Sequence, residues 1–214
     1  MATKVGVVDY GAGNLLNVVN ALKYCGAHVY IITNPEQVIH ADKIILPGVG
    51  AFQDGMNVLR EKNLIEPIID YIATERPYLG ICLGMQFLFE ASHEFGVTAG
   101  LDVIKGEVIA IPSTTSTGTI RRVPHVGWAS IESANDKENN NCRILNGITG
   151  EDSFYFVHSF MCVPKNSSVI SSITEYMGLP IVASISYKNV YGTQFHPEKS
   201  GESGLKVLKN FLQL

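Results

Sequence analysis

Charged residues are scarce in this sequence, at 17% of its 214 residues, and the basic ones do not gather into a stripe. The formal net charge is −4 at pH 7, so the composition argues against a nucleic-acid-binding protein. No run approaches the roughly 18 consecutive apolar residues that a membrane-spanning helix needs. The N-terminal residues have no signal-peptide pattern, because Asp9 interrupts the apolar run. We therefore expect a cytoplasmic protein that binds neither nucleic acid nor membrane.

Cysteine and histidine patterns that bind metals are also missing. No C-x-x-C pair occurs, and the wide spacing of the four cysteines predicts free thiols in a reducing compartment. His93-Glu94 is not continued to a second histidine as in H-E-x-x-H. The remaining candidates are not clustered by spacing; they are His28, His40, His125 and His158. We therefore expect no metal site.

The glycine-rich stretches lack the residues that would bind a nucleotide. Gly50 and Gly55 have the separation of a phosphate-binding loop, but Met56 and Asn57 stand where that loop has Lys and Ser or Thr. The glycines at 11 and 13 are not followed by the third glycine of a dinucleotide fingerprint. No cofactor is expected.

Apolar residues make up 46% of the chain, enough for the buried core of one domain, residues 1–214. In the first half, short apolar runs alternate with stretches of helical spacing, as in a doubly wound parallel sheet. The expected strands are 4–9, 28–33, 43–46 and 78–81, and the expected helices are 14–25, 52–60, 64–74 and 83–93.

After Gly96 the pattern changes to strands joined by short turns. The expected strands are 103–111, 128–131, 153–163, 169–174, 181–187 and 190–195, followed by an amphipathic helix at 202–212. Polar loops are expected at 112–118 and 134–141. The predicted fold is therefore α/β, with a doubly wound, mostly parallel sheet and an antiparallel extension.

One cysteine lies between two glycines, in the segment Gly-Ile-Cys-Leu-Gly at 80–84. An expected strand leads into Cys82 and an expected helix leads out, which is the arrangement of a nucleophile elbow with Cys in place of Ser. The start of a helix presents free N–H groups that favour the thiolate. The N–H of Leu83 is then placed to stabilise an oxyanion. The alternative is a buried cysteine that only packs between two turn glycines.

A His-Pro-Glu sequence follows the last expected strand. Residues two apart in an extended segment point the same way, so His196 and Glu198 can pair. A carboxylate that orients an imidazole makes it a base able to take a proton from a thiol. Alone, the motif also fits a surface turn; combined with the cysteine elbow, it indicates a catalytic pair.

Two further glycines follow the third expected strand, in Pro-Gly-Val-Gly at 47–50. Ligands of open α/β sheets bind at the carboxyl ends of strands, and glycine lets a backbone approach them closely. Gly48 and Gly50 also allow a peptide flip, so an N–H of this turn can face toward a ligand or away from it.

Together, these three segments resemble the landmarks of the class I (triad) glutamine amidotransferases, in that family's order. They are Pro-Gly-Val-Gly at 47–50, Gly-Ile-Cys-Leu-Gly-Met-Gln at 80–86 and Gln-Phe-His-Pro-Glu-Lys-Ser at 194–200. Within this family, the chain is most similar to the glutaminase subunits of imidazole glycerol phosphate synthase. That similarity rests on Asp-Tyr-Gly-Ala-Gly-Asn at 9–14, Pro-His-Val-Gly-Trp at 124–128 and Tyr-Phe-Val-His-Ser at 155–159.

The resemblance implies a role for each matching residue. Cys82 would attack the side-chain amide of L-glutamine, His196 would act as base and acid, and Glu198 would orient His196. It also implies oxyanion donors at Leu83, Val49 and Gly50, substrate contacts at Gly48, Gln86, His158, Ser159 and Phe160, and a partner interface at Asn14, Trp128, Tyr155 and Lys199. Packing roles stay open for three of these: Trp128 in the core, Tyr155 within a strand and Asn14 as a helix cap.

Ammonia released in water is mostly protonated and then is no nucleophile, so a partner must receive it through a sheltered path. The resemblance implies a cyclase subunit with a (β/α)₈ barrel, in a heterodimer that forms imidazole glycerol phosphate and AICAR in histidine biosynthesis. One alternative is a paralogous subunit that supplies ammonia for surface-sugar biosynthesis with the same triad. Another is a catalytically silent scaffold subunit, which would need no triad. Related cysteine-elbow hydrolases and chaperones lack the C-terminal His-Pro-Glu.

Overall fold

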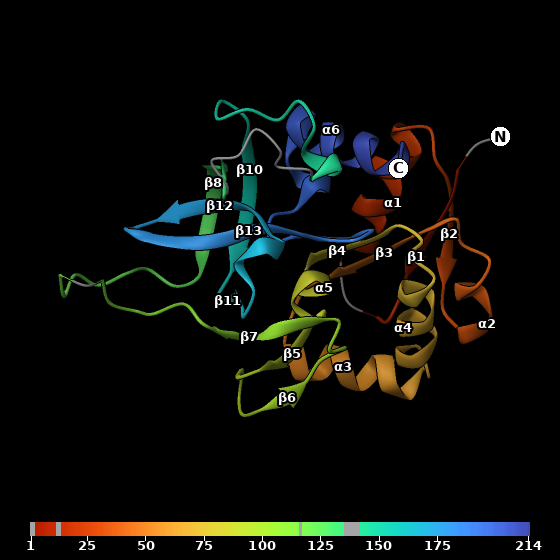
Figure 1. The fold of residues 1–214 in the computed structure, drawn as a ribbon, viewed down its shortest axis with the longest axis horizontal. Helices are drawn as coiled ribbons and strands as arrows, with labels where there is room; N and C mark the ends of the chain where they lie inside the picture. Colours follow the sequence, from red (N-terminus) through yellow and green to blue (C-terminus); the bar gives the residue numbers. More distant parts are fainter. Residues whose placement is uncertain (1–2, 12–13, 116, 135–141) are drawn as a thin grey trace.

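The computed structural model describes residues 3–11, 14–115, 117–134 and 142–214. Its centre is an eight-stranded sheet with the order β2-β1-β3-β4-β14-β13-β12-β9 (Figure 1). Neighbouring strands from β2 to β14 run parallel, whereas β13, β12 and β9 continue the sheet antiparallel. The predicted parallel sheet with an antiparallel extension is thus confirmed. Its strands are β1 (Lys4–Val8), β2 (His28–Ile32), β3 (Lys43–Gly48), β4 (Tyr78–Cys82), β9 (Glu132–Ser133), β12 (Ile170–Tyr176), β13 (Leu179–Tyr187) and β14 (Val190–Thr193).

Helices cover both faces of this sheet (Figure 1). On one face lie α1 (Leu15–Tyr24) and α6 (Gly201–Leu212), and on the other lie α2 (Pro35–Val38), α3 (Phe52–Glu61) and α4 (Ile65–Ala73). Each face has its own apolar cluster, one including Val18 and Phe211 and the other including Phe52 and Ile68. Strands buried on both faces form continuous apolar runs, which is why the first half of the sequence predicted them well. No helix in the described part of the chain is long and apolar enough to cross a membrane.

Two smaller sheets complete the chain. The first has the order β11-β7-β5-β6, and the second pairs β10 with β8. A single strand was expected over 153–163, which is wrong, because the chain changes sheet at Ser159, whose carbonyl accepts a hydrogen bond from Ile111. The strands are β5 (Phe89–Ser92), β6 (Thr98–Ala99), β7 (Ile104–Ala110), β8 (His125–Ser130), β10 (Ser153–His158) and β11 (Phe160–Pro164), and the short helices are α5 (Leu83–Gln86), η1 (Arg143–Leu145), η2 (Ser167–Val169) and η3 (Pro197–Lys199).

The helix predicted over 83–93 is also wrong beyond its first turn, because α5 ends at Gln86. A continued helix needs the carbonyls of Phe87 and Leu88 as acceptors for its own N–H groups. Here they accept hydrogen bonds from Leu101 and Ile104, at 2.7 and 2.9 Å, and the chain continues as β5. Tertiary pairing therefore overrides a local pattern of helical spacing.

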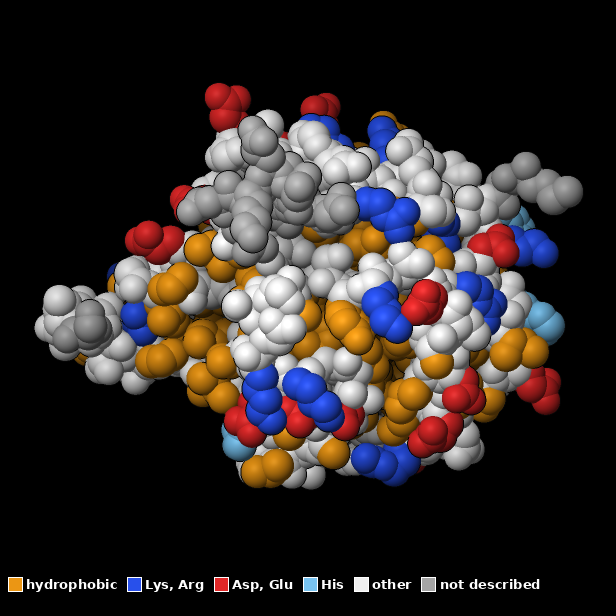
Figure 2. Space-filling view, in the orientation of Figure 1, with side chains coloured by type: hydrophobic (Ala, Val, Ile, Leu, Met, Phe, Trp, Pro, Cys, Tyr) orange, Lys and Arg blue, Asp and Glu red, His pale blue; other side chains and the backbone are white. Residues whose placement is uncertain are grey.

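The segment between β7 and β8 projects from the body alongside the β12–β13 hairpin (Figure 1). Arg121 fixes its base, donating from Nη1 to the carbonyls of Pro112 and Thr114 at 2.6 and 3.0 Å. Apolar side chains are exposed here, with Ile120 at 77%. Figure 2 shows hydrophobic side chains gathered over this end, while charges of both signs are mixed elsewhere on that face. The loop predicted at 134–141 lies outside the described residues except for its first residue.

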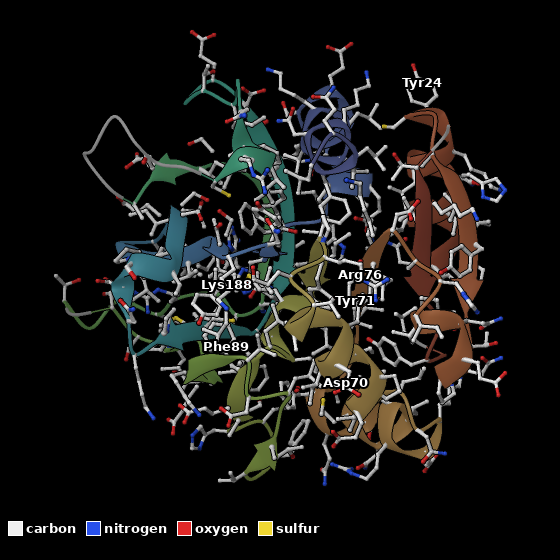
Figure 3. All side chains as sticks on the ribbon, turned by 45° about the vertical axis from the view of Figure 1, so that its right-hand side comes forward. Tyr24, Asp70, Tyr71, Arg76, Phe89 and Lys188 are labelled. Carbon is white, nitrogen blue, oxygen red and sulfur yellow. The ribbon has the colours of Figure 1, made fainter. Side chains whose placement is uncertain are left out.

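Contacts at the start of β4 hold the strand that carries Cys82. Figure 3 shows Tyr71 and Arg76 next to each other, with the guanidinium 4.2 Å from the centre of the Tyr71 ring. Arg76 also donates to the carbonyl of Ala41 at 2.9 Å, and the Tyr71 hydroxyl lies 3.0 Å from the carbonyl of Asp42. These bonds tie the α4–β4 connection to the residues that precede β3, so the two strands are held in register.

Candidate active site

The three sequence landmarks meet at the carboxyl edge of the parallel sheet. In the β3–β4 pairing, Gly48 lies opposite Cys82. In the β14–β4 pairing, Thr193 lies opposite Ile81, so the segment that carries His196 leaves the sheet beside the cysteine. Parallel strands that end together place their following loops around one crevice, which is where open α/β sheets bind ligands.

Cys82 occupies a sharp turn between β4 and α5. Its φ of 53° and ψ of −107° lie in a region that side chains rarely adopt. A Cβ added at Gly80 would come 2.4 Å from the Gly84 carbonyl oxygen, and one at Gly84 would come 1.8 Å from the Leu46 carbonyl oxygen. Only glycine fits at both places, as the elbow interpretation requires. Because α5 is a single turn, its dipole adds less to thiolate stability than the longer predicted helix would.

His196 and Glu198 form a buried pair beside the cysteine. Nδ1 of His196 lies 2.8 Å from Oε1 of Glu198, and their side chains are 1% and 0% exposed. The predicted contact is confirmed, although Pro197–Lys199 form a 3₁₀ turn rather than the extended segment from which it was argued. Burial lowers the pKa of His196, but Cys82 and Glu198 outweigh it and raise the pKa to about 10. The cysteine and the carboxylate therefore favour the protonated imidazole, which is the form that can give a proton to a leaving group.

A pocket of about 390 Å³ opens in front of the cysteine. It collects most residues that the sequence predicted as oxyanion or substrate contacts; its lining is Val49, Gly50, Cys82, Leu83, Gln86, Glu94, Pro124, Val157, His158, Ser159, Phe160 and Lys199. The predicted substrate contact Gly48 is not part of this lining. It lies beneath the turn, where a Cβ would come 2.3 Å from the Tyr10 hydroxyl and 2.8 Å from the Leu83 Cβ.

Two residues of this site were missed from the sequence. Glu94 lines the pocket and its Oε2 accepts the N–H of Phe52 at 2.7 Å, which fixes the carboxylate at the start of α3. Gln194 is fully buried, and its Nε2 lies 3.5 Å from the Cys82 sulfur. Gln194 was within reach of prediction, because it is two residues before His196 on the same strand end. No signal in the sequence indicated Glu94.

Of the four residues predicted to meet a partner, only Lys199 is in the lining of this pocket. Trp128 and Tyr155 are edge-to-face neighbours with ring centres 6.1 Å apart, and the Lys199 ammonium lies 5.6 Å from the Tyr155 ring centre. Trp128 is 58% exposed, so the alternative of a core tryptophan is wrong. Asn14 stands at the start of α1 but makes no side-chain capping bond. Its Nδ2 donates instead to Oε1 of Glu198.

Two buried histidines, His125 and His158, form what we call the histidine pair, of which His158 lines the pocket. Nδ1 of His125 lies 3.2 Å from Nε2 of His158, whose Nδ1 lies 2.8 Å from the Phe160 carbonyl oxygen. The His125 ring stacks between Phe156 and Tyr176, with ring centres 4.9 and 4.0 Å away. Burial lowers the pKa of both histidines to about 4, so the pair is neutral at physiological pH.

The comparison with known protein families agrees with this geometry. The family described as "Glutamine amidotransferase class-I" matches residues 6–214. The chain belongs to the class I glutamine amidotransferase family. Among its relatives in this family, the imidazole glycerol phosphate synthase subunit HisH 1 of Legionella pneumophila (strain Paris) is 47% identical over 99% of this chain and 100% of that protein. The subunit HisH of Desulfitobacterium hafniense (strain DSM 10664 / DCB-2) is 42% identical over 97% of this chain and 92% of that protein.

Solved structures share this amidotransferase fold at lower sequence identity. PurLQS from Thermotoga maritima matches with a TM-score of 0.75 and 22% identity, covering 100% of this chain and 99% of that one. A glutamine amidotransferase from Thermotoga maritima matches with a TM-score of 0.62 and 14% identity, covering 92% of this chain and 77% of that one. At these identities the likeness concerns the fold alone.

Proposed function

We propose that this chain is the glutaminase subunit of an imidazole glycerol phosphate synthase, in which residues 1–214 form one domain. It hydrolyses L-glutamine to glutamate and ammonia and passes the ammonia to a cyclase subunit of histidine biosynthesis. The observation that carries the glutaminase is that Cys82 lines the pocket and interacts with His196, which forms a buried pair with Glu198. The histidine pathway is favoured over a surface-sugar paralog by relatives named as HisH subunits, at 41–47% identity over nearly the full chain.

The chemistry begins with attack of the Cys82 sulfur on the amide carbon of glutamine. N–H groups of Leu83 and of the Val49–Gly50 turn would stabilise the oxyanion that forms. As the C–N bond breaks, His196 gives its proton to the leaving nitrogen, which departs as ammonia. Water then attacks the glutamyl thioester while His196 takes its proton, and glutamate leaves as the Cys82 thiolate and the protonated His196 are restored. Glu198 holds the imidazole in place for both proton transfers.

The pocket offers complementary groups for a free amino acid. The Glu94 carboxylate is available to the α-ammonium group of glutamine. Both N–H groups of the Gln86 amide face protein acceptors, the Phe160 carbonyl at 3.3 Å and Gln194 Oε1 at 3.1 Å. Its Oε1 therefore serves as the acceptor for an N–H of the substrate. Backbone groups of His158, Ser159 and Phe160 complete the contacts.

The ammonia needs a partner, and we propose a cyclase subunit with a (β/α)₈ barrel that docks over the pocket mouth. Trp128, Tyr155 and Lys199 form a contiguous aromatic and basic surface there. Asn14 joins this surface to the triad carboxylate, so docking and catalysis share a residue. The free thiols at all four cysteines fit a reducing compartment, and we place the reaction in the cytoplasm.

Complementation tests the proposed pathway. A bacterial strain that lacks only its own glutaminase subunit of the synthase should grow without histidine when it expresses this chain together with its cognate cyclase. The Cys82→Ala chain, expressed at the same level, should fail unless the medium is rich in ammonium. Growth restored equally by both chains without added ammonium would exclude the proposed role.

A further inference from the structure

A continuous buried hydrogen-bond chain connects the histidine pair to the nucleophile. Gln86 Nε2 lies 3.3 Å from the Phe160 carbonyl oxygen and 3.1 Å from Gln194 Oε1, and Gln194 Nε2 lies 3.5 Å from the Cys82 sulfur. The Phe160 carbonyl also accepts from His158 at 2.8 Å. Gln86 is 5% exposed and Gln194 is 0% exposed, so water does not compete for these bonds.

The donor and the acceptor of each hydrogen bond follow from one atom, the carbonyl oxygen of Phe160. A backbone carbonyl can only accept, so the Gln86 atom that faces Phe160 must be its NH₂ group. The same NH₂ group faces Gln194, so the Gln194 atom on that side must be its oxygen. Its NH₂ group is then turned to Cys82. The amide orientation of Gln194, which is ambiguous for an isolated side chain, is fixed by the network.

The same argument sets the tautomers of the histidine pair. His158 must carry its proton on Nδ1, because that atom faces the Phe160 carbonyl. Its Nε2 is therefore an acceptor, and His125 must donate from Nδ1. Both histidines are neutral, as this pattern requires. Each hydrogen bond between His125 and the sulfur therefore has one defined donor and one defined acceptor.

We propose that Gln194 is a further catalytic residue, whose side-chain amide donates an N–H to the Cys82 sulfur and stabilises the thiolate. A charged sulfur accepts such a bond more strongly than a neutral thiol does, so the bond favours the reactive form. Because α5 is a single turn, its dipole is small and stabilises the thiolate only weakly, so a hydrogen bond from Gln194 adds to that stabilisation. The inference rests on the proposed glutaminase, since it adds a residue to that same site.

The test measures thiolate reactivity directly and needs no turnover. Iodoacetamide alkylation at Cys82, followed by mass spectrometry of the peptide that contains it, gives a rate at each pH. A hydrogen bond to a charged group corresponds to about one to two pH units. In Gln194→Met, which has a similar volume and no donor, the midpoint of the alkylation profile should rise by that amount. With the partner present, kcat for glutamine should fall roughly 10- to 100-fold while KM changes little.

Two variants separate this role from a structural one. Gln194→Glu keeps the acceptor for Gln86 but presents a carboxylate to the sulfur, so its midpoint should rise at least as far as in the Met variant. Thr193→Val removes the neighbouring buried bond from Oγ1 to the Phe195 carbonyl, 3.0 Å long. It should lower Tm and leave the alkylation midpoint unchanged.

An unchanged alkylation midpoint in both Gln194 variants would overturn the inference, even if the wild type proves to be an active glutaminase. If the midpoint shifts as expected but the wild-type complex releases no glutamate, the inference about Gln194 stands and the proposed function fails. Should Gln194→Met not fold, Gln194→Leu, which also lacks a donor and carries no charge, takes its place with the same expected rise and the same contradicting result.

Discussion

The histidine pair provides a test of how the pocket wall is held. In His125→Phe the ring can still stack between Phe156 and Tyr176, but the N–H to His158 is lost. An orphaned buried acceptor costs about 1–3 kcal/mol. His158 can then rotate to find a donor for its Nε2, which breaks its bond to the carbonyl of Phe160 in the pocket proposed to bind glutamine. If about 1.4 kcal/mol of that cost appears in substrate binding, KM for glutamine rises roughly tenfold.

His125→Asn is the matched control, because its amide N–H occupies nearly the place of the imidazole Nδ1–H. It keeps the donor to His158 and loses the stacking, for which aromatic pairs are worth about 0.5–1.5 kcal/mol each. We expect KM close to the wild-type value and a lower free energy of unfolding, measured in urea. Steady-state glutamate release and equilibrium denaturation of both variants give the two quantities. A Phe variant with normal KM, together with an Asn variant with raised KM, would refute the donor argument.

Three further outcomes follow from the geometry. Glu198→Gln should lower kcat roughly 10²- to 10⁴-fold with little change in KM, because the imidazole loses its orienting charge. A rise in KM by a similar factor would instead indicate that the pocket has collapsed. Gly84→Ala places a Cβ 1.8 Å from the Leu46 carbonyl oxygen and should cost about 3 kcal/mol or more, whereas Gly150→Ala, with open space around it, should be near neutral by urea denaturation. Unfolding should take up protons between pH 6.5 and 4, because the histidine pair has its pKa lowered from 6.5 to about 4. The free energy of unfolding should therefore decrease as the pH is lowered from 6.5 to 4, by on the order of 3 kcal/mol per histidine, and His125→Phe should show a shallower slope.

Local signals in the sequence were sufficient to predict the elbow and the contact between His196 and Glu198. Gly80 is required by a steric limit within one turn, and His196 is close to Glu198 in the chain, so both features are local, whereas Gly84 is required by the Leu46 carbonyl of the neighbouring strand. The buried parallel strands were likewise visible as apolar runs between helical stretches. These features depend on a few neighbouring residues, and their physical causes can be stated without the tertiary structure.

The features that were missed depend on contacts between distant segments. The end of α5 is set by Leu101 and Ile104, whose N–H groups take the carbonyls a longer helix would use. Glu94 reaches the pocket only because the chain runs through β5 just before it instead of continuing α5. The role of Gln194 depends on an amide orientation that the carbonyl of Phe160 fixes from another strand. No periodicity or motif carries that information.

The central claim is that this chain only supplies ammonia, through Cys82, to a reaction that its partner completes. The most direct measurement uses the purified complex of this chain with its cyclase and compares product formation from glutamine and from an ammonium salt. Cys82→Ala should abolish synthesis with glutamine and leave synthesis with ammonium at the wild-type rate. Retained use of glutamine by this variant, or loss of both activities in a complex that still assembles, would contradict the account.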